Sequence, residues 1–356
     1  MFDRIVQKAG KDSQQIQAQA VHIGIDEKRV REIIDEKMQG AIDIFTNEAY
    51  DVALNRVSIF RDQLVPRMVE KQMLDAFADP AFQLQLIEAQ KAAAASERPL
   101  DYNLLSELLI HRVEKRNDRE TLAGISRAVT IVDEITDDAL LALTIAYVFG
   151  QFYPTTGNII EGLDVLDNLY GKIANNVLPT GSQWIEHLDV LSAVRISSFS
   201  GLKNVSSFFP TKVCAYALPG IKKDSESHES ALKILANANI SSESLVVHEL
   251  NSDYLRFNFT SNINEAAIDG ASINNNPIQP IQTQALKDVF ALYTNDQSIK
   301  NDFVTLFMNE WNNRLNLKMV GNWWDAIPFG FSITAVGRVL AHANAQRIDP
   351  TIPPIS

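Results

Sequence analysis

Residues 136–152 read TDDALLALTIAYVFGQF, and the part that follows the two aspartates is the most apolar stretch of the chain. Thr136 is a residue type that caps helix N-termini, and Asp137 and Asp138 suit the first helical turn because the helix dipole favours negative charge there. The apolar run is shorter than the roughly 20 residues that a membrane-spanning helix needs. We therefore predict a buried helix in a helical core and no transmembrane segment.

Helix-start signals recur along the chain on both sides of this stretch. Each consists of a capping residue type followed by apolar residues at the spacing of one helical face. The predicted starts are Asp79 with Pro80, Asp101 and Asp118, and two more helices are expected over residues 159–173 and 183–196. The connections are short, so neighbouring helices should pack antiparallel in a bundle or layered array.

The region before these helices shows one continuous apolar stripe. From residue 27 to Pro66, residues such as Val30, Ile34 and Phe60 recur at steps that place them on one face of a helix. A single helix of this length would measure about 57 Å at roughly 1.5 Å per residue. Because a compact core needs less, we expect a kink or a neighbouring subunit to take up part of the stripe.

The sequence pattern changes near residue 203, where prolines and serines become frequent and helical stripes become rare. Strands are expected where Val, Tyr and Phe are enriched around a polar turn. The expected elements are a helix over 231–239, strands over 244–250 and 254–260, helices over 283–293 and 296–312, a last helix capped by Thr334, and an extended surface tail over 349–356.

These patterns predict a mainly α protein, a helical bundle or layered array with an N-terminal β-prone tag and a smaller mixed α/β C-terminal region. The predicted domains are a tag over residues 1–26, a helical domain over 27–202, and a mixed α/β region with a closing helix and extended tail over 203–356.

The tag is the one stretch near the N-terminus with the period of a strand. Gln15, Gln17 and Gln19 alternate with Ile16 and small residues, which places the glutamines on one face. A lone strand needs a sheet to join, so the segment either pairs with the small sheet of its own chain or with its copy in another chain. We favour the copy, because glutamine rows suit amide ladders between like strands, and we expect a homo-oligomer.

Composition narrows the classes of partner. The formal net charge of −12 and a pI near 5.0 disfavour nucleic acid and anionic membranes, since both attract Lys and Arg. The single cysteine, Cys214, cannot form an internal disulfide, and the chain begins without a signal-like apolar run. We therefore expect a cytoplasmic protein with a possible protein partner, no membrane contact and no nucleic acid.

The common catalytic motifs do not occur. The sequence lacks the glycine-rich phosphate loops, the nucleophile elbow, and the His and Glu spacings of helical di-iron and zinc-protease sites. We expect neither a cofactor nor a metal, and we assign no catalytic residue. An enzyme with scattered groups stays as the alternative, with His248, Glu249, Arg338 and His342 as first candidates, and a nucleic-acid-binding protein as a second alternative that the charge disfavours.

A polar stripe marks the last helix. Arg338, His342 and Gln346 follow one another at four-residue steps and therefore share one helical face. This face could contact a ligand or a partner, or it could be solvated; the spacing leaves both open.

Three segments together resemble a known family. GKDSQQIQA at residues 10–18, HELN at 248–251 and VGRVLAHANAQRIDPTIPP at 336–354 are similar to an uncharacterised family of bacterial cytoplasmic proteins with a G-x-x-S-x-x-I-Q-A tag. The resemblance implies an association with mobile or phage-defence-like genes, and it supplies no activity and no catalytic residue. The leading hypothesis is an interaction or assembly protein, self-associating through the tag, in phage defence.

Overall fold

The computed structural model describes residues 26–42, 47–174, 177–197, 200–259, 272–273 and 276–355. These residues form fifteen α-helices and three small antiparallel sheets, so the predicted mainly α class is confirmed. Within them, no helix combines the length and the apolar character that spanning a membrane requires.

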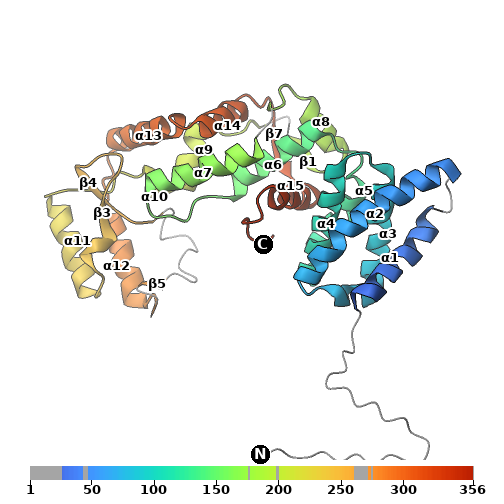
Figure 1. The fold of residues 1–356 in the computed structure, drawn as a ribbon. Coiled ribbons are helices and arrows are strands. Elements are labelled where there is room, and N and C mark those ends of the chain that lie inside the picture. The colour runs from blue at the N-terminus through green and yellow to red at the C-terminus, as the bar shows by residue number, and fades with distance from the viewer. Residues whose placement is uncertain are drawn as a thin grey trace, which may run out of the picture.

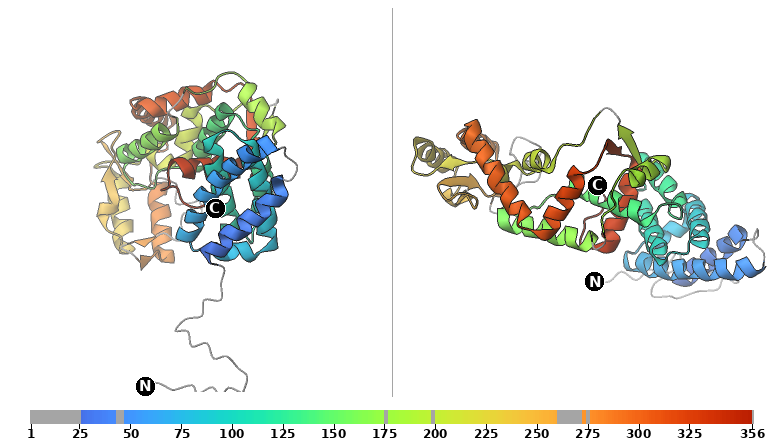
Figure 2. Two further views of the ribbon diagram at one scale, coloured as in Figure 1. Left: turned by 45° about the vertical axis from the view of Figure 1, so that its right-hand side comes forward. Right: turned by 90° about the horizontal axis from the view of Figure 1, so that it is seen from above.

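The helices are arranged along an elongated molecule (Figure 1). One end holds α1 (Glu27–Ile42), α2 (Asn47–Glu70), α3 (Pro80–Ala95), α4 (Pro99–Glu114) and α5 (Arg119–Thr130). The middle holds α6 (Asp137–Gln151), α7 (Ile159–Ile173), α8 (Gln183–Val190), α9 (Val205–Lys212), α14 (Leu315–Asp325) and α15 (Ala335–Ile348). The far end holds α11 (Glu226–Asn237) and α12 (Pro280–Ala291), and α10 (Cys214–Ala217) and α13 (Gln297–Asn312) lead towards it (Figures 1 and 2).

The predicted apolar helix is α6, and it lies in the core as expected. Thr136 caps it by accepting the N–H of Ala139 at 3.3 Å. Ten of its residues from Ala139 to Phe149 are buried, and α15 packs along it. Because α6 is buried over most of its length, the residues from Ala139 to Phe149 are almost all apolar.

Local caps explain most helix starts. Asp79 accepts the N–H of Ala81 at the start of α3, and Asp118 accepts two backbone N–H groups at the start of α5, as predicted. The predicted start at Asp101 is wrong, because α4 begins at Pro99. The Asp101 carboxylate is buried and accepts hydrogen bonds from Ser96 and Arg98.

The apolar stripe predicted over residues 27–66, with a kink or a neighbouring subunit to take up part of its length, is divided between two helices. Helix α1 ends at Ile42, α2 begins at Asn47, and the two helices pack against each other. Val30 and Ile34 of α1 and Phe60 of α2 are fully buried. The apolar stripe is thus covered within the chain, because it belongs to two helices rather than one.

The sheets are small, and one of them joins distant parts of the chain. Strand β1 (Val194–Ser197) pairs with β7 (Gly330–Ile333), and in the second sheet the order is β2 (Ile221–Lys222), β4 (Tyr254–Phe257), β3 (Leu245–Val247). A third pairs β5 (Ser272–Ile273) with β6 (Asn276–Pro277). The helix predicted to reach residue 196 instead ends at Val190, since the following residues pair with β7.

The C-terminal tail differs from its prediction. The side chains of Ile352 and Ile355 are 7% and 6% exposed, so the tail is tucked against the core instead of lying on the surface. Gln346 of α15 donates from its amide to the carbonyl oxygens of Ile352 and Pro353 at 3.0 and 3.1 Å. Apolar burial and these two hydrogen bonds hold the tail.

The buried apolar residues form two clusters. The larger extends from Val30 to Ile355, and α15 contributes to it by packing against α4, α5 and α6. The smaller lies under the β2–β4–β3 sheet and includes Leu235 of α11, Phe257 of β4 and Val289 of α12. The domain boundary near residue 202 stays a prediction.

We expect Gly337→Ala to lower the free energy of unfolding by about 1–3 kcal/mol, the usual cost of overpacking. A Cβ at Gly337 would lie 2.1 Å from the carbonyl oxygen of Ala193, a backbone atom that also accepts hydrogen bonds from Thr334. The matched control is Gly150→Ala in α6, where a Cβ would meet no atom within 4 Å. That change should be neutral or stabilising by up to about 1 kcal/mol. Urea unfolding followed by circular dichroism checks both, and equal stability of the two variants would refute the close approach of α15 to Ala193.

Candidate functional site

The three residues of the predicted polar stripe have different surroundings. Arg338 is exposed and forms an ion pair with Glu120 of α5, Nη2 to Oε1 at 3.1 Å. His342 is only 2% exposed. Gln346 points towards the C-terminal tail. The stripe is therefore not one open face, because α4, α5 and α6 surround α15.

The buried part of the stripe belongs to a pair of histidines. His111 of α4 and His342 are buried, and their ring centroids lie 5.2 Å apart. His111 Nε2 lies 2.6 Å from Gln346 Oε1, and His342 Nδ1 lies 3.1 Å from the hydroxyl of Tyr147. Since the Gln346 amide nitrogen donates to the tail, its oxygen faces His111, and the proton of neutral His111 sits on Nε2.

Burial sets the charge of this pair. Removal from water lowers the pKa of His111. It also lowers the pKa of His342 to about 4, and the neighbouring His111 acts in the same direction. Both rings are therefore neutral at pH 7. The contacts of the pair in the described residues are ring packing and, through Gln346, attachment of the tail.

A cavity of about 480 Å³ opens beside Tyr147 and Arg338, among α6, α9, α14, β7 and α15. Its volume falls in the range of small-molecule sites, roughly 300–1,000 Å³. The wall combines cationic and aromatic side chains: Lys203, Lys212, Arg338, Tyr147, Phe208, Trp324 and Phe331. Among the described residues that line it, none is Asp or Glu.

Lys212 is the half-buried cation of this cavity. Its ammonium donates to the carbonyl oxygen of Gly150 near the C-terminus of α6, where the helix dipole favours positive charge. It also lies 5.8 Å from the ring centroid of Tyr153 and 6.0 Å from that of Phe208. Burial lowers the pKa of Lys212. No carboxylate in the described part of the chain lies within ion-pair distance of it.

The aromatic wall is held in place from behind. Trp324 is largely buried, stacks on Phe149 with ring centroids 4.3 Å apart, and donates its indole N–H to the carbonyl oxygen of Lys203 at 2.9 Å. Phe208 also stacks on Phe149, at 5.4 Å. Because these rings are fixed by the core, the cavity wall is formed before any ligand arrives.

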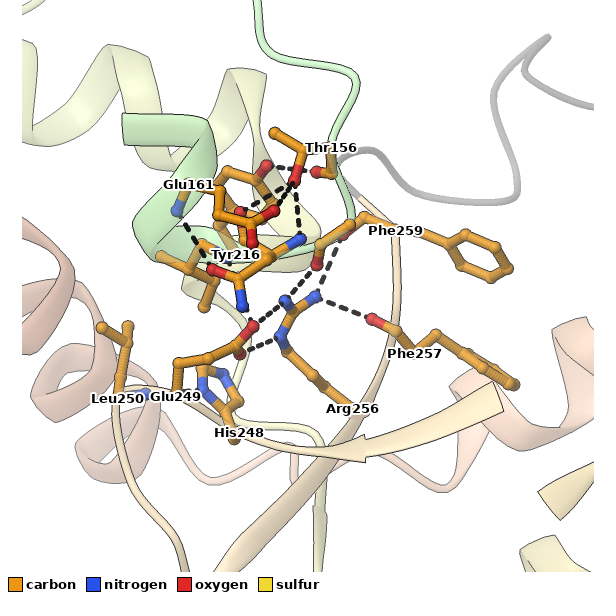
Figure 3. Close-up of polar contacts among 12 residues, drawn as sticks. Thr156, Glu161, Tyr216, His248, Glu249, Leu250, Arg256, Phe257 and Phe259 are labelled. Carbon is orange, nitrogen blue, oxygen red and sulfur yellow. Dashed lines mark hydrogen bonds and ion pairs between the residues drawn. The ribbon is translucent and has the colours of Figure 1, made fainter. Parts of the chain in front are cut away.

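A second polar cluster lies between β4 and the start of α7 (Figure 3). Arg256 of β4 is fully buried, and its Nε and Nη2 donate to the two carboxylate oxygens of Glu249, each at 2.7 Å. Its Nη1 donates to the carbonyl oxygens of Phe257 and Phe259, and Nη2 also donates to that of Gly157. All five guanidinium N–H groups are thus occupied.

Glu249 and His248 belong to the same cluster, the Arg256 joint. Burial alone would raise the pKa of Glu249, but hydrogen bonds and charge from Arg256 outweigh it, and the pKa is lowered. Glu249 also accepts the N–H of Ile159 in the first turn of α7 at 3.3 Å. His248 is 1% exposed, faces the carbonyl oxygen of Leu218 at 3.0 Å, and has its pKa lowered to about 4 by burial. The cluster ties the β3–β4 hairpin to the start of α7.

The four candidates of the enzyme alternative therefore fall in two places. His248 and Glu249 belong to the Arg256 joint, whereas Arg338 and His342 lie on α15, in another part of the molecule (Figure 1). In the described residues, no three or more His, Cys, Asp or Glu side chains are grouped to hold a metal ion.

A protein-family model, with the bare description ":-like", matches residues 24–352. The chain belongs to this family. No curated protein and no solved structure matches the chain. The family region takes in the cavity, the histidine pair and the Arg256 joint, and it leaves out Gln15, Ile16, Gln17 and Gln19, which also lie outside the described residues.

Sequence reasoning missed several residues of these sites. Lys203, Lys212 and Tyr147 come from separate helices and loops, and no spacing connects them with Arg338. One signal was present in the sequence: Arg256 lies within YLRFNFT, the predicted strand over residues 254–260, and a charge in an apolar strand requires a buried partner.

Proposed function

We propose that this protein is a cytoplasmic interaction protein that self-associates through its N-terminal segment and acts in bacterial phage defence. The observation that carries the proposal is the start of the helical body. Asp26 Oδ1 accepts the N–H of Arg29 at 2.8 Å, so the cap of α1 comes from the last residue of the predicted tag and does not depend on residues 1–25. The family match begins at residue 24, which is consistent with a separate element attached to the body.

The chemistry of the segment supports pairing between copies. Gln15, Gln17 and Gln19 share one face of the predicted strand, where like strands in register can form side-chain amide ladders. The alternative is pairing within the chain, since the order β2–β4–β3 leaves β2 and β3 as edge strands. The setting in phage defence, and a second protein as partner, rest on the resemblance of the tag and of residues 336–354 to the bacterial family.

Deleting residues 1–25 tests the proposal. The truncated protein should keep its helical circular dichroism and melting temperature, because the cap at Asp26 remains, while light scattering should report a lower native mass. An unchanged oligomer would rule out pairing between copies. A chain that no longer folds would point to the sheet within the molecule.

Two full-length variants test whether the glutamine amides, and not merely the presence of the segment, are needed for assembly. Lysine at Gln15, Gln17 and Gln19 places like charges opposite one another between copies and should abolish assembly. Asparagine at the same three positions keeps the amides and should retain it. Equal native masses of the two variants would argue against the ladder.

A further inference from the structure

The cavity beside α15 has an excess of positive charge that acidic side chains do not neutralise. The whole chain has a formal net charge of −12, yet this wall has three cationic residues and, among the described residues, no acidic one. Arg338 is partly balanced by Glu120 at the rim, 3.1 Å away. Lys203 and Lys212 have no carboxylate within ion-pair distance in the described part of the chain. Two positive charges are therefore available to a ligand.

Of the two lysines, Lys212 is the one whose charge is more in need of compensation by an anion. Its ammonium is half-buried, and a cation taken out of water costs free energy unless an opposite charge compensates. The carbonyl oxygen of Gly150 receives one of its three N–H groups. The remaining donors can reach an anion in the cavity.

The rest of the wall suits a flat ring. Tyr147, Phe208, Trp324 and Phe331 all line the cavity, and Phe208 and Trp324 are fixed by stacking on Phe149. Aromatic side chains prefer stacked or edge-on contacts with other rings, worth about 0.5–1.5 kcal/mol beyond area burial. An inorganic anion would leave this surface unused.

We propose that this cavity binds a small phosphate ester that carries a planar ring. A phosphate monoester has a charge of about −1.5 to −2 at pH 7, which matches the two free ammonium groups better than a single carboxylate would. Its ring would lie against the aromatic wall, and Lys212 and Lys203 would contact the phosphate. This ligand site is independent of the proposed self-association.

Isothermal titration calorimetry on the full-length chain tests the site. The probes are phenyl phosphate and the four ribonucleoside 5′-monophosphates. The control ligands carry only one half of each probe: inorganic phosphate for the anion, and phenol or the nucleoside for the ring. At least one ring-bearing phosphate should bind one molecule per chain, at least tenfold more tightly than either of its halves. The absence of binding by every ring-bearing phosphate at millimolar concentration would overturn the proposal. Equal binding of inorganic phosphate would overturn it as well.

Variants of the two lysines place the binding in this cavity. Lys212→Gln and Lys203→Gln should each weaken the tightest probe at least tenfold, and Lys203 is exposed, so its variant keeps the fold. The matched control is Lys233→Gln on the exposed face of α11, which should leave the affinity unchanged. Melting temperatures verify folding. Binding that survives both cavity variants would refute the assignment.

Discussion

Arg256→Met is expected to lower the free energy of unfolding by about 3–5 kcal/mol, because it leaves the half-buried carboxylate of Glu249 without its partner. It also leaves the carbonyl oxygens of Phe257, Phe259 and Gly157 without their donor. Urea unfolding followed by circular dichroism measures the loss. The joint between β4 and the start of α7 should open first.

A double-mutant cycle separates the ion pair from packing. The double variant Arg256→Met/Glu249→Met should lose less free energy of unfolding than the sum of the two single variants. In each single variant one buried charge is left without its partner, whereas the double variant leaves no charge behind. The matched surface pair is Arg338 with Glu120, whose side chains are 45% and 77% exposed. Arg338→Met should cost no more than about 1 kcal/mol. A similar small cost for Arg256→Met would contradict its buried, paired position.

Acidification should destabilise the protein strongly through its buried histidines. His248 and His342 have folded-state pKa values of about 4 against a usual value of 6.5, and the pKa of His111 is also lowered. Between these values the unfolded chain binds protons that the folded chain does not. Stability is therefore full above pH 6.5 and falls as the pH drops towards 4, by about 1.4 kcal/mol per pH unit for each of His248 and His342. His248 and His342 would each account for about 3 kcal/mol at pH 4.

Urea unfolding at pH values from 7 to 5 measures this slope before most carboxylates titrate. His342→Asn should make the slope shallower, since one proton-binding difference is removed. Val339→Ala serves as a matched control, because Val339 is 1% exposed on the same helix and does not titrate. It should lower stability equally at every pH. An unchanged slope in His342→Asn would mean that His342 is not kept neutral by burial.

The sequence alone determined the features that depend on neighbouring residues. The caps at Asp79, Asp118, Thr136 and Thr334 were correctly predicted, because a cap is a contact between residues two or three positions apart. The mainly α class followed from the helical period of the apolar residues. The buried helix α6 followed from its continuous apolar run.

Errors arose where a distant partner overrides a local pattern. Asp101 is a good capping residue by type, but its carboxylate accepts hydrogen bonds from Ser96 and Arg98 instead of capping a helix. Residues 194–196 were predicted to end a helix, but they pair with β7, which lies far along the sequence. The tail over residues 349–356 was predicted to lie extended on the surface, but Ile352 and Ile355 are buried.

The candidate sites were decided by tertiary structure. His111 meets Gln346, and Arg256 meets the carbonyl oxygen of Gly157, across sequence separations of 235 and 99 residues. The cavity draws its lysines from the loop before α9 and the end of α9, and its arginine from α15. Local periodicity carries no information about such pairs. They form because packing of α15 among α4, α5 and α6 and burial of the charged groups require particular partners, which only the folded chain brings together.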